Sequence, residues 1–328
     1  MLKQAEFEDR CRVRGLDDAA VGRALETVRA FERAVPRDVG VADAPLAAID
    51  AALASMSAAG GLDEGALMAL ARYYAVLGHV DASIRLLAYL LPVGVLEAMG
   101  VRLGELEGDD RAGRVMSRLS IPPVGSPPEA YPAATARFVS ALLDELGPER
   151  AAKALAWNVH GIPASAFAAE RDRLRELGSI DAWLDDYHDR QVAELASHAA
   201  DGTLWFEQRI TPEVVEFVRA NREIQGGVRV GDRILVTKIP YDPDRFLRSG
   251  DALERRRLAC HCPLAASSIT ATGAGVDPAW CACSAGYTKF MFDVAFGEET
   301  EAEVLSSVLA GDPICRFSIR MPASYAGG

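Results

Sequence analysis

Two short cysteine pairs toward the end of this sequence are the residues best suited to chemistry. They are Cys260-His261-Cys262 and Cys281-Ala282-Cys283, and they hold four of the six cysteines in the chain. Four thiolates in two close pairs form the ligand set of a tetrahedral zinc site or of an iron–sulfur cluster. We therefore predict that Cys260, Cys262, Cys281 and Cys283 bind a metal, with zinc or an iron–sulfur cluster as the cofactor.

The spacing of these pairs differs from that of the common zinc knuckle. A knuckle has two residues between its cysteines, whereas each pair here has one. Such tight pairs also ligate soft metals such as Cu(I). The alternative without function is that the cysteines are small buried hydrophobic residues, since cysteine is among the most buried residue types.

A second functional interpretation makes a thiol the nucleophile. Cys283 lies at the start of a predicted helix, where unpaired N–H groups and the helix dipole would lower a thiol pKa. His261 could serve as a base or as an extra ligand. Lys289 and Asp293 share a face of the same helix and could assist the cysteine, although an i,i+4 surface ion pair looks the same in sequence.

Mixed helices and strands must position these residues. Residues 228–239 are rich in β-branched side chains around a Gly-Asp turn, which predicts a strand or a hairpin. Residues 284–296 read as a helix, and residues 303–308 as either a strand or a short helix, with the strand favoured. Alternation over 315–321 predicts a half-buried strand bearing Cys315. We expect residues 205–328 to form a cysteine-rich α/β domain with an antiparallel sheet.

The preceding two hundred residues show helical periodicity almost throughout. Residues 1–120 and 129–204 are predicted as helical regions, so the fold class is α+β. Between them, residues 121–128 contain four prolines, which favour extended backbone. This segment is predicted to be a linker or a long surface loop.

Composition and charge narrow the class of function. The net charge of -12 and the pI near 5.0 disfavour nucleic acid as a partner. The longest apolar run is about ten residues, short of the roughly twenty that a membrane span needs. Since no signal peptide or phosphate-binding glycine loop is present, we expect a cytoplasmic protein with reduced thiols and a small-molecule ligand. The sequence leaves a homo-oligomer open.

The cysteine-rich region resembles known families over about residues 205–321. The stretch 281–287 and the motif Gly-Asp-Pro-Ile-Cys-Arg-Phe at 311–317 are similar to two groups. These are the 4-vinyl-reductase-like small-molecule-binding domains and the L-2-amino-thiazoline-4-carboxylic acid hydrolase-like proteins. The resemblance implies an α/β ligand-binding fold. It implies either opening of a small sulfur- and nitrogen-containing ring or binding of a small hydrophobic ligand.

These observations favour an enzyme that acts on a small organic substrate, a hydrolase or a metal-dependent enzyme. The rival is a small-molecule or metal sensor with a structural four-cysteine zinc site. A closed site of four cysteines would be structural, because a catalytic metal needs an open coordination position.

Overall fold

A computed structural model describes residues 1–36, 38–271 and 273–326. The chain forms two compact units, each built from more than one stretch of sequence. Unit 1 contains Met1–Gly94 and Ser120–Ala134, and unit 2 contains Val95–Leu119 and the residues from Thr135 onward. The two units are described separately below.

Unit 1 is helical. Its helices begin where a side chain can accept a hydrogen bond from a free backbone N–H group, as Asp63 does from Ala66 at 2.7 Å. Gly78, with a φ of 80°, ends the same helix in the left-handed conformation. The elements are α1 (Gln4–Val13), α2 (Asp18–Ala34), α3 (Leu46–Ala58), α4 (Glu64–Leu77), α5 (Val80–Leu90) and the 3-10 turn η1 (Pro128–Ala130).

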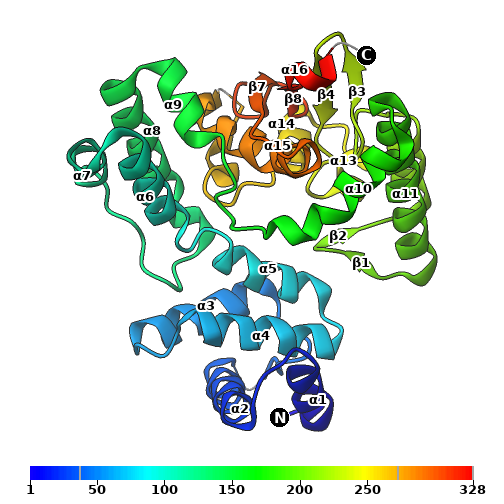
Figure 1. Ribbon diagram of the computed structural model, residues 1–328. Helices are drawn as coiled ribbons and strands as arrows, with labels where there is room; N and C mark the ends of the chain where they lie inside the picture. The colour runs from blue at the N-terminus through cyan, green and yellow to red at the C-terminus, as the bar shows by residue number, and fades with distance from the viewer. Residues whose placement is uncertain (37, 272, 327–328) are drawn as a thin grey trace. The chain divides into compact units, whose positions relative to one another are not determined.

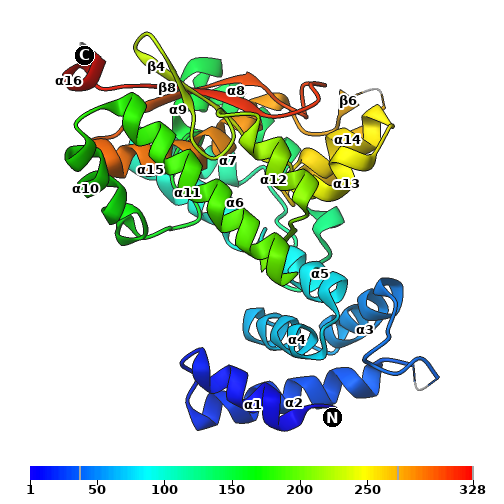
Figure 2. The same cartoon turned by 90° about the vertical axis from the view of Figure 1, so that its right-hand side faces the viewer.

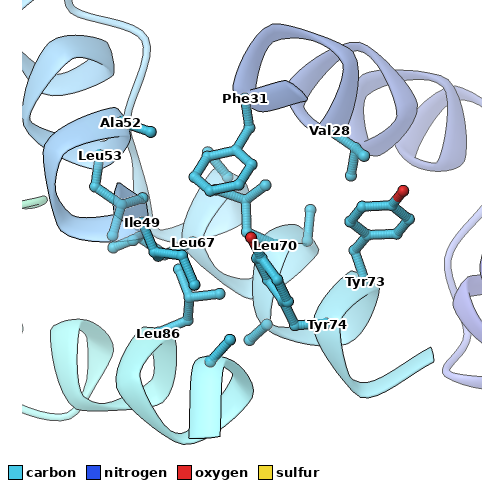
Figure 3. Packing of buried hydrophobic residues seen from close by; sticks show 14 of the residues in the cluster. Val28, Phe31, Ile49, Ala52, Leu53, Leu67, Leu70, Tyr73, Tyr74 and Leu86 are labelled. Atoms are coloured by element: carbon cyan, nitrogen blue, oxygen red, sulfur yellow. The ribbon is translucent and has the colours of Figure 1, made fainter. Parts of the chain in front are cut away.

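The core of unit 1 lies between α1, α2, α3, α4 and α5. Figure 3 shows Phe31 and Tyr74 reaching toward each other from α2 and α4, and their rings meet edge to face. The proline-rich segment belongs to this unit, because Val124 packs against the core. A methyl group at Gly125 would lie 2.8 Å from a methyl carbon of Leu62. The segment is therefore a loop across unit 1.

Over its described residues, unit 2 combines helices with three small antiparallel sheets. Its helices are α6 (Val95–Glu107), α7 (Asp109–Met116), α8 (Pro132–Leu146), α9 (Pro148–Leu155), α10 (Ala168–Leu177), α11 (Ile180–Asp201), α12 (Pro212–Arg219), α13 (Pro243–Arg248), α14 (Ala252–Ala259), α15 (Ala282–Phe296) and α16 (Ala323–Ala326). Its strands and 3-10 turns are β1 (Leu204–Trp205), β2 (Gln208–Arg209), β3 (Val228–Val230), β4 (Arg233–Thr237), β5 (Ile269–Thr270), β6 (Gly273–Ala274), β7 (Glu301–Ser306), β8 (Arg316–Arg320), η2 (Ala164–Phe167), η3 (Ala266–Ser268) and η4 (Pro278–Cys281). Figure 2 shows α11 beside α12, against which it packs.

The largest sheet has the strand order β3-β4-β8-β7, with antiparallel neighbours throughout. The register pairs Ile234 with Ile319 and Val236 with Phe317. Successive side chains of a strand point to opposite faces. These apolar residues therefore share one face, where Ile234, Val236 and Ile319 join the core that contains Phe292 of α15. Figure 1 shows α15 next to β7 and β8.

α15 carries the second cysteine pair and packs unusually closely at one residue. A methyl group added to Gly286 would lie 2.1 Å from the backbone nitrogen of Trp157 and 2.4 Å from the carbonyl carbon of Ala156. Only a glycine lets the helix approach the backbone after α9 this closely. The glycine that follows the second pair thus serves helix packing.

The predicted α+β class is confirmed, with helices first and an antiparallel sheet later. The hairpin at 228–239 is confirmed as β3 and β4, and the strands predicted at 303–308 and 315–321 are present as β7 and β8. β7 begins two residues earlier than predicted, and β8 is more buried than predicted, because Ser318 on its polar side is 1% exposed. The compact units, however, do not follow the predicted domain boundaries of 1–120, 121–128, 129–204 and 205–328. The reason is that α6 and α7 pack with the helices and strands that follow residue 134.

By length and composition, one described helical stretch could cross a membrane. It is Val80–Glu107, with 28 residues and a mean hydropathy of 1.7 over its most apolar window. It includes α5, α6 and the turn between them. The core helix of a folded domain has the same character, so the stretch is weak support for a membrane segment.

Candidate functional site

Five cysteines of unit 2 come together from different segments, and we call them the thiol cluster. Cys260 and Cys262 follow α14, Cys281 and Cys283 lie at the start of α15, and Cys315 directly precedes β8. Cys260 lies close enough to Cys262, Cys315 and Cys281 for their charges to act on it. Cys283 is in turn affected by Cys262 and Cys281. The structure therefore brings together the four predicted ligands and adds Cys315.

Several sulfurs of the thiol cluster receive hydrogen bonds. The indole Nε1–H of Trp280 donates to the sulfur of Cys262 at 3.2 Å. The backbone N–H groups of Leu264 and Ala265 also act on this sulfur. These donors follow Cys262 by two and three residues, so the local turn points backbone N–H groups at the sulfur. Such donors stabilise thiolate charge and are a feature of metal–thiolate centres.

The thiols themselves are buried, and this determines their protonation. Burial raises the pKa of Cys281 to about 12. Burial also raises the pKa of Cys283, with the charge of Cys262 as the second cause. The expected lowering of the Cys283 pKa by the helix start is therefore wrong, because desolvation of the thiolate outweighs the helix dipole. Without a metal, these two thiols are protonated at neutral pH.

His261 lies within the first cysteine pair, as its position in the sequence requires. Its Nε2 atom is 2.5 Å from the carbonyl oxygen of Ile239, and its ring meets the ring of Tyr241 edge to face. Burial and the charge of Lys238 lower the pKa of His261 to about 3, so the ring is neutral. A carbonyl oxygen can only accept, so Nε2 carries the hydrogen and Nδ1 keeps the lone pair.

Lys238 stands at the centre of this arrangement. Its ammonium group donates to the hydroxyl of Ser284 at 2.9 Å and lies 5.2 Å from the centre of the Tyr287 ring. Its backbone N–H donates to the carbonyl oxygen of Cys315 at 2.9 Å. The charge of Lys238 lowers the pKa values of Cys262, Cys281, Cys283 and Cys315 against the larger effect of burial.

The side of the cluster near Lys238 reaches the surface. Tyr287 is 43% exposed, and its ring packs edge to face against His160. Tyr241 donates a hydrogen bond to Glu207 at 3.1 Å, and burial raises the pKa of that carboxyl group. Aromatic rings and titratable groups therefore border the cluster where it approaches solvent.

A pocket of about 410 Å³ lies on the face of the sheet opposite to Lys238 and Cys315, because Thr237 and Arg316 line it and successive side chains of a strand point to opposite faces. Its lining includes Thr237 and Ile314, the immediate chain neighbours of Lys238 and Cys315. Phe217 and Phe246 give it an apolar wall, and Arg316 pairs there with Glu223 through both carboxylate oxygens. Pockets that bind small molecules have volumes of about this size.

Lys289 and Asp293 do not join the cysteines. The ammonium of Lys289 is buried and lies 2.6 Å from a carboxylate oxygen of Asp293 and 3.4 Å from Glu299. The other carboxylate oxygen of Asp293 accepts from the backbone N–H and the hydroxyl of Thr300. The pair ties α15 to the start of β7, so its contacts are structural and offer nothing to Cys283.

The sulfur atoms of the cluster are ligands that suit a soft metal, but the side chains are not arranged in the geometry of a metal site. Within the described ranges, no three Cys, His, Asp or Glu side chains are grouped so that they could hold one ion as they stand. Closing a metal site would require the thiols to turn about their side-chain bonds.

Lys238 and Trp280 belong to the site but were not predicted, although the sequence contains an indication of each. Lys238 continues the alternation of Ile234 and Val236, so it shares their face toward α15. A lysine on an otherwise apolar strand face is a polar residue in a position that needs a partner. Trp280 directly precedes the second cysteine pair and brings a side-chain N–H donor beside it.

Comparisons with known proteins give one match. Residues 242–325 match a family of unknown function, DUF6144. The matched segment is less than half of the chain, and it includes all five residues of the thiol cluster. Neither the curated proteins nor the solved structures contain a match.

Proposed function

We propose that the chain is a cytoplasmic enzyme that acts on a small organic substrate at a metal centre formed by Cys260, Cys262, Cys281 and Cys283. The observation that carries this proposal is the convergence of these sulfurs, with Cys315, around the half-buried ammonium of Lys238. Sulfur is the donor that zinc, copper(I) and iron–sulfur clusters select.

A metal explains the chemistry of the cluster better than a free nucleophile does. A free nucleophilic thiol needs a lowered pKa, whereas burial raises the pKa values of Cys281 and Cys283. A bound cation reverses this effect, because it deprotonates a coordinating thiol outright. N–H groups directed at Cys262 would then have a thiolate to stabilise.

The enzyme part of the proposal has separate support. The exposed Tyr287 and the neutral His261 offer contacts and a free ring nitrogen near the thiols. The resemblance to ring-opening hydrolases, over the segment that carries the cysteines, agrees with a small sulfur- and nitrogen-containing substrate.

Burial of the cysteines favours a second candidate, a sensor or binding module with a structural metal site. The side chains of Cys260, Cys281, Cys283 and Cys315 are all at most 8% exposed. A closed four-cysteine site holds structure and leaves no position for a substrate. Turnover of a small substrate separates this candidate from the enzyme, since both bind metal.

Metal analysis of the purified protein is the first test. Prepared anaerobically with reductant, the wild-type protein should contain a stoichiometric soft metal, and Cys262→Ser should lose most of it. Cys262 is chosen because its sulfur already receives the Trp280 indole N–H. A brown sample indicates an iron–sulfur cluster, whereas colourless metal-loaded protein indicates zinc.

Cys11→Ser is the matched control. Cys11 is also a buried free cysteine, but it lies on α1 in unit 1. It should leave the metal content unchanged. Metal-free wild-type protein after metal supplementation, or full metal content in Cys262→Ser, would rule out the proposed centre.

A further inference from the structure

Lys238 is a half-buried cation whose surroundings lack an ordinary counter-ion. Among the described residues, its ammonium contacts are the Ser284 hydroxyl and the Tyr287 ring, and no carboxylate lies within ion-pair distance. Placing an ammonium group in a protein without a negative partner is costly. A negative charge that develops nearby would therefore be stabilised by this residue.

The backbone fixes Lys238 beside the thiols from two directions. Its N–H donates to the carbonyl oxygen of Cys315, which joins the end of β4 to the residue before β8. Its side chain crosses to Ser284, the residue after Cys283, at 2.9 Å. The next residue, Ile239, accepts from His261 between the first cysteine pair. Lys238 and its neighbour Ile239 together thus contact the three segments that carry the five thiols.

We propose that Lys238 is the charge-compensating residue of the thiol cluster, positioned to balance the excess negative charge that the cysteines acquire when they bind a metal. This inference rests on the proposed metal centre. Four thiolates on one divalent ion leave an excess of negative charge in a poorly solvated place. A fixed ammonium nearby reduces the repulsion among the sulfurs, and Ser284 holds it in position.

Lys289 is a buried lysine of unit 2, and unlike Lys238 it has a carboxylate partner. Its ammonium is neutralised by Asp293 at 2.6 Å. Lys238 has no such carboxylate partner among the described residues, although its side chain points to the sheet face on which α15, the helix of Lys289, packs. The contrast assigns a structural role to Lys289 and leaves the charge of Lys238 available to the thiols.

Cadmium affinity tests the inference without measuring activity. Cd²⁺ is the probe because thiolates bind it tightly and the bond absorbs in the ultraviolet. Competition with a chromophoric chelator would give the affinity of the full-length reduced protein. Lys238→Met should weaken Cd²⁺ binding roughly 10- to 100-fold, the usual cost of losing an outer partner of a metal site. Lys238→Arg should retain most of the affinity, because it keeps the charge.

Two further variants keep the test interpretable. Ser284→Ala removes the hydrogen bond but not the charge, so it should weaken binding less than Lys238→Met does. Lys153→Met removes an exposed lysine of α9 and should have no effect. Wild-type affinity in folded Lys238→Met, checked by circular dichroism, overturns the inference alone. Failure of the wild-type protein to bind Cd²⁺ overturns the proposed centre and this role together.

Discussion

A Gly286→Ala variant should lose roughly 3 kcal/mol or more of its free energy of unfolding, at the upper end of the cost of overpacking. The added methyl carbon would lie 2.1 Å from the nitrogen of Trp157 and 2.4 Å from the carbonyl carbon of Ala156. Both are backbone atoms, so no side-chain rotation relieves the clash. Either α15 or the segment after α9 must move, and denaturant unfolding would measure the cost.

Gly113→Ala is the matched control for this prediction. Gly113 also lies within a helix of unit 2, and a methyl group there would meet nothing within 4 Å. Alanine should therefore stabilise the protein by about 0.5–1 kcal/mol, the usual gain over glycine in a helix. Equal stabilities of the two variants would show that the close approach of α15 is not present in solution.

The second large effect is expected at Asp293, a residue that the sequence proposed as catalytic. Asp293→Asn removes the charge that neutralises the buried ammonium of Lys289, which is 3% exposed on its side chain. Loss of the closer partner of a buried ion pair costs up to about 3–5 kcal/mol. Only Glu299, exposed and 3.4 Å from the Lys289 ammonium, would remain to offset the buried charge. Thermal and denaturant unfolding should show this loss, while the metal content per folded molecule stays at the wild-type level.

Lys289→Met separates this explanation from others. It removes the buried charge itself and leaves Asp293 with its hydrogen bonds from Thr300, so it should cost less than Asp293→Asn. Asp172→Asn, in an exposed i,i+3 pair with Arg175, should change stability by less than about 0.5 kcal/mol. A stable Asp293→Asn protein that has lost its metal would return Asp293 to the functional site.

Local patterns in the sequence predicted local structure well. The alternation of Phe317, Ile319 and Met321 gave a strand with one buried face, because side chains of a strand alternate. Thr211 and Pro212 are likewise typical of a helix start, and the Thr211 side chain accepts from the backbone N–H of Val214 at the beginning of α12. These features depend on neighbours in the chain, so periodicity and capping residues are enough to find them.

Features that depend on distant pairing were not accessible in this way. Lys238 and Cys315 meet because β4 pairs with β8, and nothing in either segment alone specifies that pairing. The division into units likewise depends on where α6 and α7 pack. The protonation of Cys283 needed the three-dimensional structure too, because the helix start was visible in sequence but the burial was not.

The strand order determines when, during synthesis of the chain, the largest sheet can be completed. β8 lies between β4 and β7, although it is made after both of them. Until the ribosome has delivered β8, its two neighbours have unpaired edges, and such edges invite association with other chains. Cys315 directly precedes β8, so the thiol cluster is completed only as the last strand of the sheet begins to be made. A nascent chain stalled before residue 315 would therefore present both aggregation-prone edges and an incomplete set of sulfurs.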